Sequence, residues 1–67
     1  MYICDLINNP AFNFNAPFRI LKCLGGDETI TVFDSTVSWD IHFDLMFQTI
    51  TAINTGDDGV LEIEYAD

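Results

Sequence analysis

The end of the chain contains the sequence pattern that most restricts the fold. Residues 60–65 read Val-Leu-Glu-Ile-Glu-Tyr, so apolar and acidic side chains alternate. Successive side chains of an extended chain point to opposite faces of a sheet. The residues expected to face a core are Leu61, Ile63 and Tyr65, and those expected to face water are Glu62 and Glu64. This pattern predicts a β-strand in a sheet that buries one face.

Two segments nearer the N-terminus also predict strands. Residues 18–24 form a short apolar run between Pro17 and a Gly-Gly pair, which suits a strand better than a helix. Residues 28–34 are rich in β-branched side chains. The Gly-Gly-Asp sequence between the two segments is typical of a hairpin turn, so we expect these strands to pair antiparallel.

Helical spacing is clear only at the N-terminus. Ile3, Leu6 and Ile7 match one face of a helix over residues 2–9, and Asn-Asn-Pro then ends it. So short a helix is not stable alone, and we expect its apolar side chains to pack on a sheet. The two phenylalanines that follow, Phe12 and Phe14, are expected to fill the core.

Residues 35–48 fit two patterns, because their apolar residues alternate as in a strand and also match helical spacing. We expect a loop with a helical turn here, then a third strand at residues 48–54 and a Thr-Gly-Asp-Asp-Gly turn before the last strand. The predicted fold class is α+β in a single domain of residues 1–67. A short N-terminal helix is followed by a mainly antiparallel sheet of about four strands, in the order α-β-β-turn-β-β.

The charge of the chain is strongly negative and unevenly distributed. Eleven acidic residues face only two basic ones, Arg19 and Lys22, which gives a formal net charge of −9. Ten of the acids lie after residue 24, where Lys and Arg do not occur. A protein that binds nucleic acid or an anionic membrane directly needs a basic surface, so we expect neither activity. The sequence has no leader-like N-terminus and no apolar run of about 20 residues, which favours the cytoplasm of a bacterial host cell.

The apolar content is high for so short a chain. Hydrophobic residues make up 49% of the sequence and nine residues are aromatic. At this length folding hides only about 60% of the surface that the unfolded chain exposes. We therefore expect a homodimer or a higher oligomer, formed by sheet edges or faces.

The residues that most often carry chemistry do not form a catalytic motif. His42 lies between Asp40 and Asp44, but no nucleophile is arranged with it in the sequence. Cys4 and Cys23 lack the Cys-x-x-Cys spacing, so we interpret them as reduced, partly buried thiols, with a disulfide between helix and strand as the alternative. Neither glycine-rich phosphate-binding pattern occurs, and we expect no cofactor.

Two metal-site patterns fit the sequence poorly. Residues 54–65 begin like a calcium loop, but Gly56 and Tyr65 stand where the third and twelfth positions need oxygen ligands. A two-metal nuclease would need several carboxylates at one point, and the candidates would converge only on neighbouring strands that share a face. Those candidates are Asp27, Glu28, Glu62 and Glu64. We therefore predict no metal site and regard catalysis as the minor alternative.

The acidic surface itself is the strongest functional candidate. Spaced carboxylates can imitate the phosphates of DNA and occupy the basic groove of a nucleic-acid-binding protein. The residues predicted to bind such a partner are Asp27, Glu28, Asp57, Asp58, Glu62, Glu64 and Asp67. The alternative is a solvated face that only keeps a small apolar protein in solution.

Taken as a whole, the sequence resembles small uncharacterised proteins of Firmicutes and their phages. The resemblance rests on "DLINNPAFNFNAPFRI" followed by hairpins that end in "DDGVLEIEY". In size and charge the chain also resembles anti-CRISPR proteins, which inhibit the RNA-guided nuclease Cas9. That resemblance implies an inhibitor that binds a basic nucleic-acid-handling protein such as Cas9 or acts indirectly on the target DNA.

The sequence leaves three other functions open. One is an oligomeric structural or accessory protein, in which the charge serves only solubility. Another is a metal-dependent DNA-nicking activity. The last is an immunity protein or antitoxin against a basic toxin, which would use the same electrostatics as the inhibitor.

Overall fold

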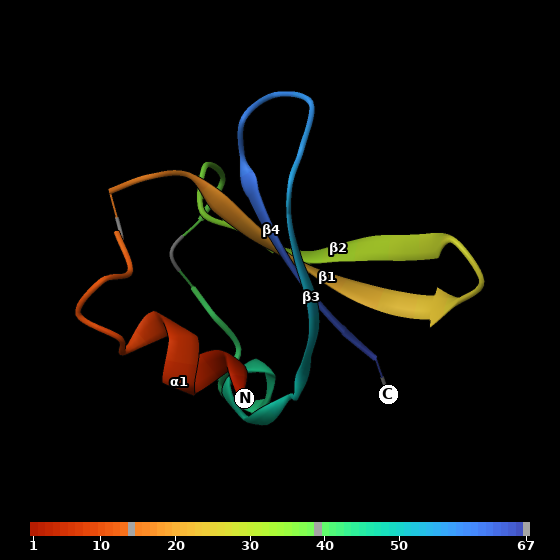
Figure 1. The fold of residues 1–67 in the computed structure, drawn as a ribbon, viewed down its shortest axis with the longest axis horizontal. Helices are drawn as coiled ribbons and strands as arrows, with labels where there is room; N and C mark the ends of the chain where they lie inside the picture. The colour runs from red at the N-terminus through yellow and green to blue at the C-terminus, as the bar shows by residue number, and fades with distance from the viewer. Residues whose placement is uncertain (14, 39, 67) are drawn as a thin grey trace.

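The structure, a computed structural model, describes residues 1–13, 15–38 and 40–66 (Figure 1). The elements are α1 (Ile3–Ile7), β1 (Phe18–Gly25), β2 (Glu28–Asp34), the 3₁₀ helix η1 (Phe43–Phe47), β3 (Ile50–Thr55) and β4 (Leu61–Ala66). The predicted α+β class and the order of the elements are confirmed. The helix is shorter than predicted, and β3 begins two residues later than expected.

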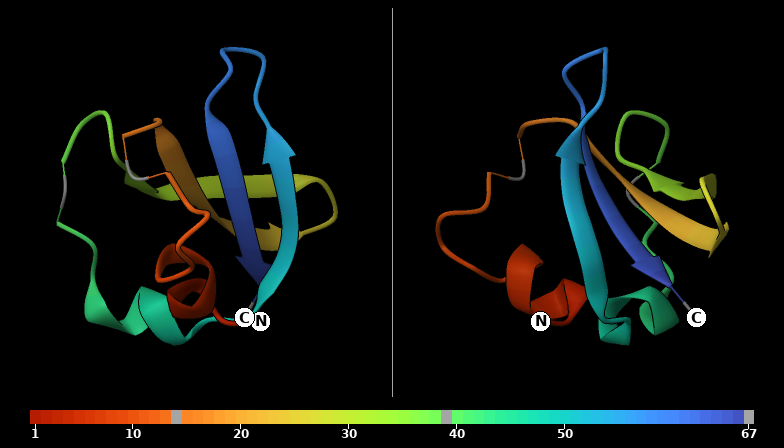
Figure 2. Two further views of the ribbon diagram at one scale, coloured as in Figure 1. Left: turned by 60° about the vertical axis from the view of Figure 1, so that its left-hand side comes forward. Right: turned by 45° about the vertical axis from the view of Figure 1, so that its right-hand side comes forward.

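The four strands form one sheet in the order β2-β1-β4-β3. The two hairpins, β1 with β2 and β3 with β4, are antiparallel as predicted. They join through a parallel pairing of β1 with β4, in which Phe18 lies opposite Leu61 and Ile20 opposite Ile63. The sheet is strongly twisted, so that the two hairpins point in different directions (Figures 1 and 2). The first and last strands of the chain thus form the centre of the sheet.

One face of the sheet is covered by α1 and η1, which lie side by side beneath it (Figure 2). Ile20 and Ile63 are completely buried at the centre of this face, and Ile3 of α1 is completely buried against them. The remaining members of the core are Ile7, Phe18, Phe33, Leu45 and Tyr65. Packing of this kind holds a five-residue helix that would not form alone.

The N-terminus is attached to the start of β3 by backbone hydrogen bonds. The amide of Ile3 donates to the carbonyl of Gln48 over 3.0 Å, and the amide of Ile50 donates to the carbonyl of Met1 over 2.8 Å. Tyr2 and Thr49 form an antiparallel bridge between these two bonds. The first residues of the chain therefore cover the beginning of this edge strand.

The described part of residues 35–48 consists of loop and the short helix η1, as predicted, and contains no strand. Leu45 is buried in the core, whereas Phe43 and Phe47 point outward and stack edge to face with their ring centroids 5.0 Å apart. Phe12 packs edge to face on Phe18, which confirms its predicted position against the core. Phe14 lies outside the described residues.

The alternation in β4 is only partly as expected. Ile63 and Tyr65 are buried in the core, and Leu61 is half-buried and packs against it. Glu62 and Glu64 are half-buried rather than open to water. The reason is that β4 lies between two other strands, so neighbouring side chains cover its second face. Neither helix of the described chain has the length and apolar character needed to cross a membrane.

Candidate functional site

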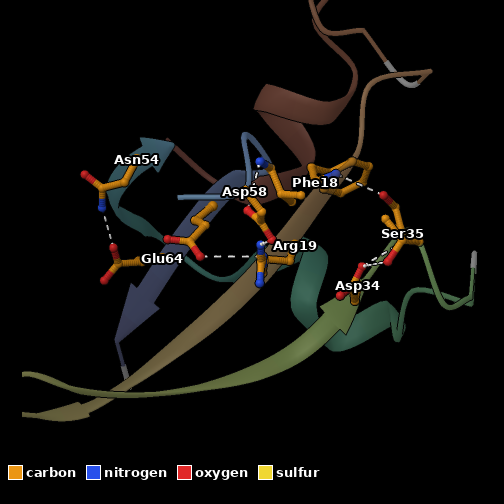
Figure 3. A network of polar contacts seen from close by, with 10 residues as sticks. Phe18, Arg19, Asp34, Ser35, Asn54, Asp58 and Glu64 are labelled. Atoms are coloured by element: carbon orange, nitrogen blue, oxygen red, sulfur yellow. Dashed lines mark hydrogen bonds and ion pairs between the residues drawn. The ribbon is translucent and has the colours of Figure 1, made fainter. Parts of the chain in front are cut away.

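The sheet face opposite the helices holds a cluster of charges around Arg19 of β1 (Figure 3). Arg19 lies next to Glu62 in the parallel β1–β4 register. Its Nη2 donates to Asp58 of the β3–β4 turn, and its Nε lies 3.5 Å from Oε2 of Glu62. Only 21% of the Arg19 side chain is exposed. The β1–β4 pairing therefore places one of the two basic residues between two carboxylates.

A third carboxylate, Asp34 at the end of β2, contributes to the same field. Asp34 lies opposite Arg19 in the β1–β2 register. Its Oδ1 accepts hydrogen bonds from the Thr36 hydroxyl and amide over 2.6 and 2.9 Å. These bonds, and to a smaller degree the charge of Arg19, hold the pKa of Asp34 below its usual value. The cluster thus remains negative even though it contains a guanidinium.

The hydrogen bonds of Asp58 explain how the turn is held over Arg19. Asp58 Oδ1 accepts from the Val60 amide over 3.1 Å, while Oδ2 accepts from Arg19. Both bonds, the backbone bond first, lower the pKa of Asp58. The pKa of Arg19 is raised, chiefly by its hydrogen bond to Asp58. The Arg19 Nε is buried and lacks a well-directed hydrogen bond, so Glu62 acts on it through charge.

Gly56 leaves the space that these carboxylates occupy. A Cβ at this position would lie 3.0 Å from Asp58 Oδ1 and 3.1 Å from Glu62 Oε2. Both distances are shorter than ordinary van der Waals contact, so a side chain would displace the acids. The absence of a side chain at Gly56 therefore provides the space in which the two carboxylates lie.

Glu64 belongs to a second polar group on the same face. Its Oε2 accepts from the side-chain amide of Asn54 on β3 (Figure 3). Its Oε1 accepts from Cys23 Sγ of β1 over 3.4 Å. Burial, followed by the contact with Glu64, raises the pKa of the Cys23 thiol. Cys4 and Cys23 are both half-buried free thiols. Cys23 thus serves as a hydrogen-bond donor, and no disulfide links it to Cys4.

The predicted binding acids fall into two separate parts of the molecule. Asp27 and Glu28 lie at the β1–β2 turn, whereas Asp57 and Asp58 lie at the β3–β4 turn, and the two turns project in different directions (Figure 1). Among the predicted acids that the structure describes, Asp58 and Glu62 are brought together through Arg19. Asp67 lies outside the described residues.

Exposure further separates the predicted residues. Asp27, Glu28 and Asp57 are exposed, and their carboxylates make no hydrogen bond or ion pair with described residues. Asp58 keeps 57% of its side chain exposed although it binds Arg19. Glu62 has 24% exposed and faces the same guanidinium. Asp27, Glu28 and Asp57 thus present unneutralised charge to solvent.

The alternatives based on chemistry find little support in the geometry. Strand β1 separates Asp27 and Glu28 from β4, so the four carboxylates of the nuclease hypothesis do not converge. Within the described ranges no three His, Cys, Asp or Glu side chains are grouped closely enough to hold a metal ion. His42 is exposed, and its Nδ1 accepts from the Asp44 amide over 3.3 Å. It therefore caps the start of η1.

Sequence reasoning missed Arg19, Asp34 and Gly56 as parts of one cluster. A usable signal was present, because Arg19 alternates with the buried Phe18 and Ile20 and must leave the core face. The sequence did not indicate that β4, with Glu62, would lie beside Arg19 of β1.

Comparisons with known proteins give no relative from which a function could be transferred. No protein-family model matches the sequence, and neither a curated protein nor a solved structure matches the chain significantly. The functional conclusion therefore rests on the charges and contacts of this chain.

Proposed function

We propose that the protein is an acidic inhibitor that binds a basic nucleic-acid-handling protein. The observation that carries this proposal is the distribution of free charge. Asp27, Glu28 and Asp57 are exposed and unneutralised, while Arg19 is enclosed by carboxylates of its own chain. With a net charge of −9, the molecule presents its partners a strongly negative field.

The length of the molecule supports this proposal. Its longest extent is 31 Å. One strand of duplex DNA rises about 3.4 Å per nucleotide, so this length corresponds to about nine nucleotides. The carboxylates of the two turns would then meet basic residues that are well separated along the partner's groove. Charges arranged in this way mainly speed the encounter and select the partner.

Cas9 is the specific partner to test first, because size and charge resemble those of its inhibitors. The enzyme binds its guide–target duplex in a positively charged channel. An acidic domain in that channel would compete with the nucleic acid. Binding should therefore weaken as the salt concentration rises, since added ions screen such contacts.

The test measures binding of the purified protein to Cas9, and inhibition of DNA cleavage, at about 50 and 200 mM salt. The test variant carries Asp27→Lys, Glu28→Lys and Asp57→Lys. The expected result is loss of binding and inhibition in this variant, and weaker wild-type binding at high salt.

A matched control is needed because any charge reversal reduces the net charge. Asp44→Lys changes an exposed acid of η1 that lies outside the predicted surface. It makes the same change in net charge as Asp57→Lys alone, so these two single variants are compared directly. Equal loss of binding in both variants would show that only total charge matters, and unchanged binding in the test variant would overturn the proposal.

A second candidate function is an oligomeric accessory protein, which one observation favours. Several large apolar side chains are exposed, including Val37 at 82%, Phe43 at 71% and Phe47 at 55%. Exposed apolar surface of this kind often marks an interface. Sedimentation across a range of protein concentrations tests it, and a monomer at every concentration would exclude this function.

A further inference from the structure

The outer edge of β2 is open to an additional strand. β2 lies at the end of the sheet, and no strand or bridge of the described chain pairs with its outer side. All residues from Glu28 to Val32 are exposed. The other edge strand, β3, differs because residues 1–3 cover its beginning. The backbone amides and carbonyls along β2 are therefore available to another chain.

β2 contains neither Lys nor Pro, which often protect an exposed edge, and a register shift against β1 leaves Val32 as an extra residue in the strand. Natural edge strands are often blocked by Lys, by Pro or by inward-pointing charges. The middle of β2 reads Thr-Ile-Thr-Val, with β-branched residues at every position. Ile30 keeps 47% of its side chain exposed and Val32 keeps 36%. Such a segment has the conformation and side chains that favour pairing with an added strand.

A shallow hollow of about 270 Å³ lies beside the second half of this edge. Val32 and Phe33 of β2 line it together with Val37 of the following turn. Asp34 and Asp40 stand among its lining residues. In strand addition, main-chain bonds supply affinity and pockets beside the edge select side chains. The hollow would receive one apolar side chain of an added strand and place a cation beside the two carboxylates.

Charge decides which kind of chain fits. Acids lie at both ends of β2, with Asp27 and Glu28 at its start and Asp34 at its end, and Asp40 lines the hollow together with Asp34. Lys and Arg do not occur after residue 22. A second copy carries the same charge of −9. Antiparallel pairing of two copies about Thr31 would place Glu28 opposite Asp34, which is unfavourable. A basic strand meets attraction at both ends instead.

We propose that the β2 edge binds an extended basic segment of a protein partner by strand addition. The segment alternates apolar residues with Lys or Arg, and one apolar side chain enters the hollow beside Val37. This inference rests on the proposed function only in taking the partner to be basic. It adds the element that is bound and the conformation that the bound segment adopts.

The probe is a fluorescent seven-residue peptide that alternates valine with lysine and arginine, matching the length of β2. A control peptide of equal charge carries proline in place of the central valine, which prevents regular strand pairing. Anisotropy titrations are expected to show at least about tenfold weaker binding of the proline peptide. In amide hydrogen exchange, the strand-forming peptide should protect amides of β2.

Protein variants locate the site. Val37→Lys places a cation in the hollow without disturbing the core, because this side chain is 82% exposed. It is expected to weaken binding of the strand-forming peptide by about tenfold or more. Phe43→Lys makes the same change of charge at another exposed apolar residue and should weaken binding much less. Thermal unfolding of both variants verifies that the fold is kept.

The other outcomes separate this inference from the proposed function. Equal, salt-sensitive binding of both peptides would overturn strand addition and leave the electrostatic proposal standing. Absence of peptide binding together with charge-dependent capture of Cas9 would also overturn strand addition and leave the electrostatic proposal standing. Self-association that Val37→Lys abolishes would show that a second copy occupies the edge, which also overturns the inference. Absence of peptide binding and of basic-protein binding would overturn both proposals.

Discussion

The two turns of the sheet contain similar residues but use their acids differently. The β1–β2 turn contains Gly-Gly-Asp followed by Glu, and the β3–β4 turn contains Gly-Asp-Asp-Gly. The carboxylates of Asp27 and Glu28 make no hydrogen bond or ion pair with described residues, whereas Asp58 binds Arg19. The difference arises because the β3–β4 turn reaches a cation on the neighbouring β1 strand. Asp58 therefore gains a cation from the strand beside its turn, whereas Asp57 of the same turn has no side-chain partner among the described residues.

The strongest test of this comparison removes the cation. Arg19→Met would leave Asp34, Asp58 and Glu62 close together without a counter-charge, so we expect it to destabilise the fold more than any other single substitution in the cluster. Thermal unfolding should show a melting temperature lower by several degrees. Arg19→Lys keeps the charge at the same position and is the matched control. Adding Asp58→Asn to Arg19→Met should recover part of the loss, and an equally large loss in Arg19→Lys would contradict the role of the charge.

Charge reversal at the two turns should separate binding from stability. Asp27→Lys with Glu28→Lys is expected to slow association with a basic partner by about tenfold at low salt, because steering depends on exposed charge. The melting temperature should not fall, since neither carboxylate has a side-chain partner among the described residues. Asp58→Lys with Glu62→Lys should lower the melting temperature because three cations would then crowd together. Stopped-flow association and thermal unfolding measure the two effects, and the comparison fails if both pairs behave alike.

The pH dependence of stability should distinguish Asp58 from Asp57. The folded-state pKa of Asp58 is lowered, so its carboxylate stabilises the fold above the unfolded-state pKa of about 3.9. This contribution is lost as the pH falls through the folded-state value. The difference in melting temperature between wild type and Asp58→Asn should therefore be largest above about pH 4 and shrink below it. Asp57→Asn is the control, and a difference for Asp58→Asn that grows in acid would contradict the assignment.

The smallest effect is expected from Gly56→Ala. The new methyl group would push the Asp58 and Glu62 carboxylates by a few tenths of an ångström and weaken their contacts with Arg19. We expect a destabilisation of less than about 1 kcal/mol. The NMR signal of Arg19 Hε should shift. Gly26→Ala is a contrasting control, because that residue has a φ of +59° and open space around it, so it should destabilise without moving the Arg19 signal.

Local sequence patterns predicted the hairpins well and their arrangement poorly. The Gly-Gly-Asp turn and the β-branched run predicted β2 with its observed bounds. Residues 35–48 stayed ambiguous because burial of Leu45, which decides for a short 3₁₀ helix, depends on contacts with the rest of the core. The parallel pairing of β1 with β4 has no local signal. The partial burial of Glu62 and the cluster around Arg19 follow from that pairing, so they were missed with it.

The parallel pairing also has a consequence for how the chain folds during synthesis. Phe18 finds its partner only when Leu61 has been made, so the ribosome must produce both hairpins before the centre of the sheet can close. A β-hairpin that stands alone is at best marginally stable in water. Until β4 joins, the apolar side chains of β1 have no stable cover, and a nascent chain that stalls before β4 would be a target for chaperones and proteases. The last strand therefore controls when this protein becomes a folded molecule.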